Sequence, residues 1–298
     1  MKSAKTIVRL GCALLVGSAM GCKASTEPGP TPPDATIDAD NGDAGSNESP
    51  VNLAWQRFDN AGAVRHLSIE RGTEFFMFDF AESAGVGSWV EPLDLEDAWA
   101  VANAPFENST APLDAAWYRY DDTQGGDPVR KLNVIRGRTL FVYDYGTDAW
   151  TNSDLSTDTN AGTGWASPEG PFANNNPAPI DAAWYRFEQG QASERRLTVI
   201  RGTRQFTFDY ATGQWSGEFE LTNEGNTWVQ PNAPFASSTA PIDAAWYRYE
   251  GTGENKVRLL GVLRGTTQFT YNFLAASWNP VLDLTDGSWA QENGPFAP

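Results

Sequence analysis

Histidine and cysteine are almost absent from this chain of 298 residues, which contains one histidine and two cysteines. A single histidine excludes a zinc site built from several histidines, and His66 has no partner motif that would complete a Ser-His-Asp site. Cys12 lies in an apolar run that we expect to be removed, which leaves Cys22 alone and excludes an internal disulfide. The sequence therefore indicates no catalytic residues, and the mature chain must be stabilised by packing.

Basic residues are also scarce. The chain has 21 Lys and Arg against 38 Asp and Glu, a formal net charge of -17 at pH 7. This balance argues against binding to nucleic acid or directly to anionic lipid. Its ordinary consequence is the solubility of a surface-exposed domain.

Long apolar runs are missing except at the beginning, where Leu10 to Met20 follows three basic residues. The run is too short for a membrane-spanning helix and is typical of a secretory signal, residues 1–21. Its Gly-Cys ending resembles a bacterial lipobox, with Ala19 where leucine is usual. We therefore expect Cys22 to be acylated, for example with palmitate, and to become the first mature residue. The alternative is an ordinary signal cut near Gly21, which leaves a free thiol.

Residues 22–50 are rich in Pro, Gly, Ser and Asp and contain almost nothing apolar, so we interpret them as a disordered tether. A calcium-loop alignment of this segment fails, because Ile37 and Ala39 stand where carboxylates are required. Lys23 is not the aspartate that often retains lipoproteins at the inner membrane. We therefore expect a bacterial cell-envelope protein, attached to the outer membrane only by its lipid.

An eight-residue phrase occurs four times in the rest of the chain, as VNLAWQRF at 51–58, LDAAWYRY at 113–120, IDAAWYRF at 180–187 and IDAAWYRY at 242–249. The twelve tryptophans form three sets with one member per repeat: Trp55, Trp117, Trp184 and Trp246; Trp89, Trp150, Trp215 and Trp278; Trp99, Trp165, Trp228 and Trp289. The period of about 62–67 residues divides the chain into four units. These units are 51–110, 111–176, 177–240 and 241–298.

Each unit has the pattern of β-strands and none has a helical period. In unit two, Leu132 to Arg136 is rich in β-branched residues, and residues 141, 143 and 145 alternate onto one face. Gly137 between them suits a type II′ hairpin turn, which needs a positive φ. A shorter fourth strand is expected near the second tryptophan. Because the last unit is nearly as complete as the middle ones, we predict a closed propeller rather than an open stack.

The repeats resemble hemopexin-like repeats over residues 51–298. The family's blade begins with D-A-A-aromatic, as in Asp114 to Trp117, and continues with a hydrophobic pair, a basic residue, glycine and a later aspartate, as in Ile135 to Asp144. The resemblance implies an all-β, four-bladed β-propeller, a central channel that commonly holds ions, and an interaction module. Unit one departs from the pattern at Asn52, and the cysteines that commonly join the first and last blades are missing. The lone histidine also argues against haem held by two histidines, the ligation of the family's namesake.

The residues that begin the inner strands form the one candidate metal site: Asn52, Asp114, Asp181 and Asp243. They would ring the channel, where oxygen ligands would select a calcium or sodium ion. The alternative is that each side chain accepts a backbone N–H at the start of its strand.

Two sets of arginines also recur: Arg57, Arg119, Arg186 and Arg248, and Arg71, Arg136, Arg201 and Arg264. With Asp79, Asp144 and Asp209 we interpret them as framework pairs, with the arginines stacked on tryptophan. Function should then lie where the units differ, in the loops 121–127, 151–163, 188–194 and 250–255. Acidic, glycine-rich loops bind calcium or a basic partner, or are merely solvated.

Three functions remain open. The first is a non-catalytic interaction module for a protein or extracellular-matrix partner, which we expect to be a monomer. The second is a lectin-like carbohydrate binder, which exposure of one tryptophan set would favour. The third is a carboxylate-type envelope hydrolase, which needs two acids in one cleft. No binding residue can be named from the sequence.

Overall fold

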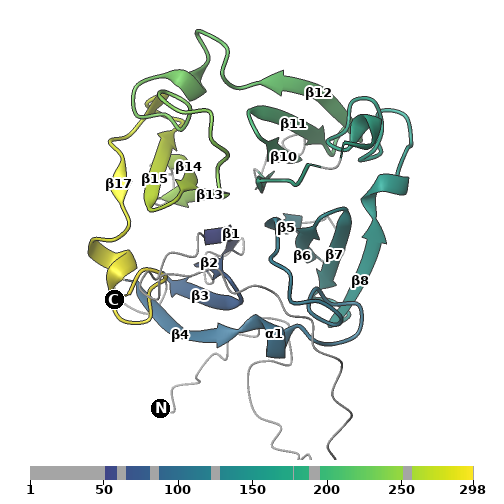
Figure 1. The fold of residues 1–298 in the computed structure, drawn as a ribbon, viewed down its shortest axis with the longest axis horizontal. Helices are drawn as coiled ribbons and strands as arrows, with labels where there is room; N and C mark the ends of the chain where they lie inside the picture. The colour runs from purple at the N-terminus through teal and green to yellow at the C-terminus, as the bar shows by residue number, and fades with distance from the viewer. Residues whose placement is uncertain are drawn as a thin grey trace, which may run out of the picture.

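The computed structural model describes residues 51–58, 65–80, 87–121, 128–176, 178–187, 195–250 and 257–297. These residues form four antiparallel sheets, one per repeat, arranged around a central axis (Figure 1). The prediction of an all-β, four-bladed propeller is confirmed. The signal peptide, Cys22, the tether and the loops 122–127, 188–194 and 251–256 lie outside the described residues. None of the described helices is long and apolar enough to cross a membrane.

Blade one contains β1 (Val51–Phe58), β2 (Arg65–Arg71), β3 (Glu74–Asp79), β4 (Ser88–Asp94) and the short helix α1 (Leu95–Ala98). Blade two contains β5 (Ala115–Asp121), β6 (Val129–Arg136), β7 (Thr139–Asp144) and β8 (Ala149–Asp154). Blade three contains β9 (Ala182–Phe187), β10 (Arg195–Arg201), β11 (Arg204–Asp209) and β12 (Gln214–Glu220). Blade four contains β13 (Ala244–Glu250), β14 (Val257–Arg264), β15 (Thr267–Asn272), β16 (Ser277–Trp278) and β17 (Leu282–Asp283). Single 3₁₀ turns lie at Leu155–Thr157, Ala173–Asn175, Thr227–Val229 and Gly287–Ala290.

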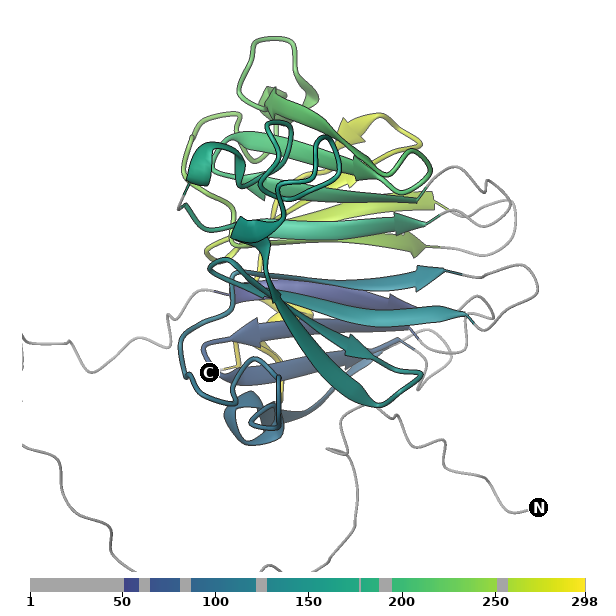
Figure 2. The same ribbon diagram turned by 90° about the vertical axis from the view of Figure 1, so that its right-hand side faces the viewer.

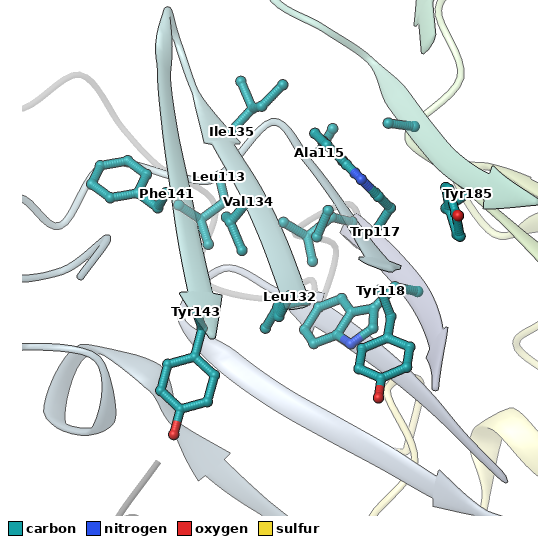
Figure 3. Packing of buried hydrophobic residues seen from close by; sticks show 14 of the residues in the cluster. Leu113, Ala115, Trp117, Tyr118, Leu132, Val134, Ile135, Phe141, Tyr143 and Tyr185 are labelled. Atoms are coloured by element: carbon teal, nitrogen blue, oxygen red, sulfur yellow. The ribbon is translucent and has the colours of Figure 1, made fainter. Parts of the chain in front are cut away.

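The four repeated phrases are the innermost strands β1, β5, β9 and β13, and the strands of all blades run between the same two rims (Figures 1 and 2). Small alanine side chains at the start of these strands let them approach the axis. In the next two strands every second residue is apolar and its side chain is buried in the core, as for Leu132, Val134, Phe141 and Tyr143 in blade two (Figure 3). The predicted hairpin glycine is confirmed, since Gly137 has φ 56 and the residue after it has no positive φ, as a type II′ turn requires.

The tryptophans join each blade to the next in a repeated chain of three rings. The first tryptophan of a blade lies beside the third of the same blade, as Trp117 does beside Trp165 at 6.0 Å between centroids. The third tryptophan then contacts the second tryptophan of the following blade. These contacts have centroid distances of 5.2, 4.9, 5.3 and 5.5 Å, for Trp99–Trp150, Trp165–Trp215, Trp228–Trp278 and Trp289–Trp89. Every tryptophan of the propeller therefore belongs to an interface between blades.

The arginine before each hairpin glycine stacks on a phenylalanine of the preceding unit, not on tryptophan. Arg136 lies 4.9 Å from the Phe106 ring and donates a hydrogen bond to the Pro105 carbonyl oxygen. The other three stacked pairs are Arg71–Phe296, Arg201–Phe172 and Arg264–Phe235. The expected pairing of these arginines with the repeated aspartates is also wrong, since His66, Lys131 and Arg196 contact Asp79, Asp144 and Asp209 respectively. The Pro-Phe pair after the third tryptophan is therefore the docking point for the next blade.

The ring closes without a disulfide. The Arg71 guanidinium donates to the Pro295 carbonyl oxygen and stacks on Phe296 at 5.3 Å, and the Trp89 indole N–H donates to the Ser288 carbonyl oxygen at 2.6 Å. Apolar side chains of blades one and four form one core cluster around these contacts. The interface that joins the two ends of the repeat array thus has the same parts as the interfaces within it.

The exchange Arg71→Gln should lower the free energy of unfolding by about 1–3 kcal/mol, because it removes a charge-assisted hydrogen bond and a cation–π contact. The measurement is denaturant unfolding, with Arg136→Gln as the matched control at an internal interface. A comparable loss in both variants is expected for a closed ring. Full stability of Arg71→Gln beside a weakened Arg136→Gln would contradict closure through this contact.

Candidate functional site

Three of the four residues predicted to ring the channel come together at one end of the axis, and the fourth, Asn52, is not among the residues that line this space. Asp114, Asp181 and Asp243 line the same narrow space, together with the alanines that follow them. Each aspartate side chain accepts a hydrogen bond from the backbone N–H of the hairpin glycine in its own blade, namely Gly137, Gly202 and Gly265. In unit one the Asn52 side-chain oxygen accepts from the Gly72 N–H at 2.7 Å. The partner is thus the turn that follows the neighbouring strand, and not the start of the same strand, as the hydrogen-bonding alternative had assumed.

A second hydrogen bond fixes each aspartate from its backbone. The Asp114 N–H donates to the Ile135 carbonyl oxygen at 2.8 Å, with equivalent bonds at Asp181 and Asp243. Each residue therefore ties the beginning of the inner strand to the end of the second strand and its turn. This structural role is sufficient to explain why an aspartate or asparagine stands at the position in every unit.

The axial space itself is small. Between the aspartates and alanines it does not admit a water molecule. Further along, between the first tryptophans and the residues beside them, the centre of a water molecule has about 10 Å³ to move in, which is just enough for one water. This part of the channel can hold a single water or ion, and no larger ligand.

Burial raises the pKa of all three aspartates above its usual range, and that of Asp181 reaches about 6. For Asp181 the carboxylates of Asp114 and Asp243 add to the rise, while the Gly202 N–H and the Arg201 guanidinium oppose it. Three like charges that meet in a narrow space would favour a cation between them. Among the described residues no three acidic, histidine or cysteine side chains are placed to hold a metal ion, and the calcium or sodium site stays a prediction.

His66 is buried, with its Nε2 atom 3.5 Å from an Asp79 carboxylate oxygen. Burial lowers its pKa, although Asp79 acts in the opposite direction. His66 thus pairs with Asp79 inside its own blade and is not among the residues that line the channel, which agrees with its interpretation as a structural residue.

Glu70 is a buried carboxyl group that the sequence interpretation missed. Its side chain is fully buried, and burial raises its pKa to about 8 although the Leu113 N–H and the Arg136 guanidinium are close enough to oppose the rise. The other units have an aliphatic residue at its position: Ile135, Ile200 and Leu263. Alignment of the repeats with one another contains this signal, because a single acid interrupts an apolar column.

A second feature missed from the sequence is a cavity of about 220 Å³ between blades three and four. Its wall from blade three carries Arg186, Arg196, Thr198, Gln205 and Thr207. Its wall from blade four is mainly aromatic, with Tyr247, Tyr271, Phe273 and Trp278. A cavity cannot be read from the sequence, because it depends on how the side chains of two blades fail to fill the space between them.

The tryptophans are not exposed as a set. Eleven of them are buried, and Trp165 is partly buried in the same core. The observation that would have favoured sugar binding by a row of exposed tryptophans is therefore missing from the described residues.

No family model matches the sequence, and no curated protein matches it. Solved structures do. A hemopexin-fold protein from cow pea matches with a TM-score of 0.51 and 13% identity over 79% of this chain and 94% of that one. This chain is a hemopexin-fold propeller.

Two further solved structures match at similar levels. A 2S albumin seed protein from Dolichos has a TM-score of 0.51 and 15% identity over 80% of this chain and 96% of its own. A plant lectin from Cicer arietinum, described as having two metal-binding sites, has a TM-score of 0.52 and 15% identity over 81% and 96%. At these identities the likeness establishes the fold alone.

The exchange Asp181→Asn should stabilise the hemopexin-fold domain in chelator at about pH 7.5, because asparagine keeps the acceptor for Gly202 and removes the buried charge. The raised pKa means that the stabilising contribution of the protonated carboxyl is present below about pH 4 and is lost as the pH rises through about 6. We expect Tm to rise by roughly 2–4 °C at pH 7.5 and to match the wild type at about pH 4.

The reverse exchange, Asn52→Asp, is the control and should lower Tm at pH 7.5. Addition of calcium to the wild type in the same assay tests whether the channel binds an ion. A calcium-dependent rise in Tm that Asp181→Asn loses would support an ion at the aspartates, and a pH-independent effect of Asp181→Asn would contradict the raised pKa.

Proposed function

We propose that this protein is a cell-envelope lipoprotein whose propeller is a non-catalytic binding module for a protein or extracellular-matrix partner. The lipid anchor rests on the lipobox-like ending at Cys22, and the tether gives the propeller reach from the membrane. The hemopexin fold supports a module of this kind, since its repeated residues serve the scaffold and leave the outer surface free to vary.

The observation that carries the proposal is an asymmetry on the outer perimeter. Phe219 on β12 is 53% exposed and pairs with Gln205 of β11. Leu282 on β17 is 48% exposed and pairs with Gln268, which is the equivalent residue of β15. At the same place blade one has Leu93, which is partly buried, and blade two has the polar Ser153. Large apolar side chains exposed on two neighbouring blades are a feature of contact surfaces.

The alternative of a carboxylate-type hydrolase has less support. Among the described residues, the acids that share a confined space are Asp114, Asp181 and Asp243, and that space does not admit a water molecule. Hydrolysis by a carboxylate pair needs room for both the attacking water and the sugar ring. The geometry therefore favours binding over catalysis.

The exchange Cys22→Ser tests the anchor. We expect palmitate labelling to be lost and the protein to move from the membrane fraction to the soluble fraction, because only acylation holds it there. Wild-type protein in the same cells provides the membrane-bound reference. Palmitate labelling that persists in Cys22→Ser would contradict the assignment.

A crosslinking pull-down from the cell envelope tests the binding surface, with a glycan array in parallel. We expect a protein partner to be captured by the wild type and lost from the double variant Phe219→Ser, Leu282→Ser. Val101→Ser is the matched control, because Val101 is 53% exposed on blade one. These surface exchanges should change stability by less than about 0.5 kcal/mol each. Capture that survives the double variant, or array binding without a protein partner, would contradict the proposal.

A further inference from the structure

The four interfaces between blades share the same tryptophan contacts, but different side chains occupy the space beside these tryptophans. Two residues of the third strand face the next blade at each interface. In blade one they are Phe75 and Met77, and Phe75 stacks on Trp55 at 5.6 Å. In blade two they are Leu140 and Val142. In these interfaces bulky apolar side chains occupy the space beside the first tryptophan.

Blades three and four both have Gln and Thr at these positions, but the two pairs are buried to different degrees. In blade four Gln268 and Thr270 are buried, and Gly261 lets the Trp246 ring lie so close that an added Cβ would come within 2.5 Å of it. In blade three the residue that replaces this glycine is Thr198, and Gln205 and Thr207 are only partly buried. The 220 Å³ cavity between blades three and four is the result.

The lining of this cavity is polar on one side and aromatic on the other. Arg186, Arg196, Thr198, Gln205 and Thr207 provide hydrogen-bond donors and hydroxyl groups, and none of the described lining residues is acidic. The Gln205 amide donates to the Thr207 hydroxyl at 3.3 Å, and Asp209 lies 3.4 Å from the Arg196 Nε atom. The side chain of Arg196 is 43% exposed, so the cavity reaches the surface at this guanidinium. Asp209 pairs with Arg196 through the Nε atom, so an anion would meet the Arg186 guanidinium and the remaining N–H groups of Arg196.

The opposite side holds the side chain of Tyr247. Its hydroxyl is buried beside Tyr249, whereas the equivalent Tyr185 hydroxyl donates to Asp121. Burial and the neighbouring Tyr249 raise the pKa of Tyr247, and the nearby Arg186 guanidinium opposes that rise. Because solvent does not reach this hydroxyl, Tyr247 contributes its ring to the aromatic wall of the cavity.

We propose that the cavity between blades three and four binds a single-ring acidic sugar, a hexuronate, with its carboxylate at Arg196 and Arg186. The size agrees, because a cavity of about 150 Å³ already holds a benzene ring. Sugar hydroxyls would meet Thr198, Gln205 and Thr207, and one face of the ring would meet the aromatic wall. This site goes beyond the function proposed above.

The test uses the purified full-length protein with three probes, namely D-galacturonate, D-galactose and benzoate. Calorimetry measures affinity, and tryptophan fluorescence reports on the cavity because Trp184, Trp228 and Trp278 line it. We expect galacturonate to bind at least about tenfold more tightly than galactose, as a charge-assisted hydrogen bond would require.

Substitutions copied from the other blades provide the variants. Arg196→Leu, which copies Leu259, should remove the preference for galacturonate over galactose. The double variant Gln205→Phe, Thr207→Met, which copies Phe75 and Met77, should fill the cavity and abolish binding of both sugars. Arg204→Leu is the matched control, because Arg204 is exposed, pairs with Glu218 at 3.0 Å and lies outside the cavity. It should bind galacturonate as the wild type does.

Three results would overturn the proposal. The first is the absence of both heat and fluorescence change with millimolar galacturonate. The second is galacturonate binding that survives in a folded Gln205→Phe, Thr207→Met variant. The third is benzoate binding as tight as that of galacturonate, which would assign the cavity to aromatic acids. Arg196 is exposed, so Arg196→Leu should fold normally. If the filled variant does not fold, the loss of the preference for galacturonate in Arg196→Leu still tests the proposal.

Discussion

The contact between the third tryptophan of one blade and the second tryptophan of the next holds the ring together. It occurs at all four interfaces, including the one between the first and last units. Each aromatic pair adds about 0.5–1.5 kcal/mol to the burial of its own surface. Because no disulfide is available within the propeller, these contacts and the arginine–phenylalanine stacks take the place of a covalent closure. Everything else, from the channel to the outer strands, is positioned by them.

The repeats made most of the architecture predictable. The tryptophan sets, the hairpin glycines and the complete last unit correctly indicated four antiparallel sheets and a closed ring. Residue partners were harder to predict. Arg136 stacks on Phe106 and not on tryptophan, and Asp114 accepts a hydrogen bond from Gly137 in the turn after the neighbouring strand. Such partners depend on which units become neighbours in space and on where a turn comes to rest, and a sequence pattern does not contain that information.

The channel site could be predicted from the sequence, and the cavity between blades three and four could not. Asp114, Asp181 and Asp243 do meet at the axis, as the pattern predicted, although their side chains already accept hydrogen bonds from glycine. The cavity between blades three and four was not predicted, because Gln205 and Thr207 look unremarkable alone and the same pair in blade four is buried. The difference arises from Thr198 against Gly261, which decides how closely a tryptophan can approach its strand. In a repeat protein, function is best sought in such small departures from a regular frame.

Glu70 makes the folding of this propeller a proton-binding reaction. In the unfolded chain its carboxyl group loses its proton near pH 4.5, whereas in the folded chain it keeps the proton up to about pH 8. Between these values the folded state binds more protons than the unfolded state, so this group's contribution to stability is complete below the lower value and disappears as the pH rises through the higher one. Near neutral pH this carboxyl group therefore takes up close to one proton when blades one and two come together. A fall in pH from about 8 increases the contribution of Glu70 to that interface, and an alkaline medium removes it.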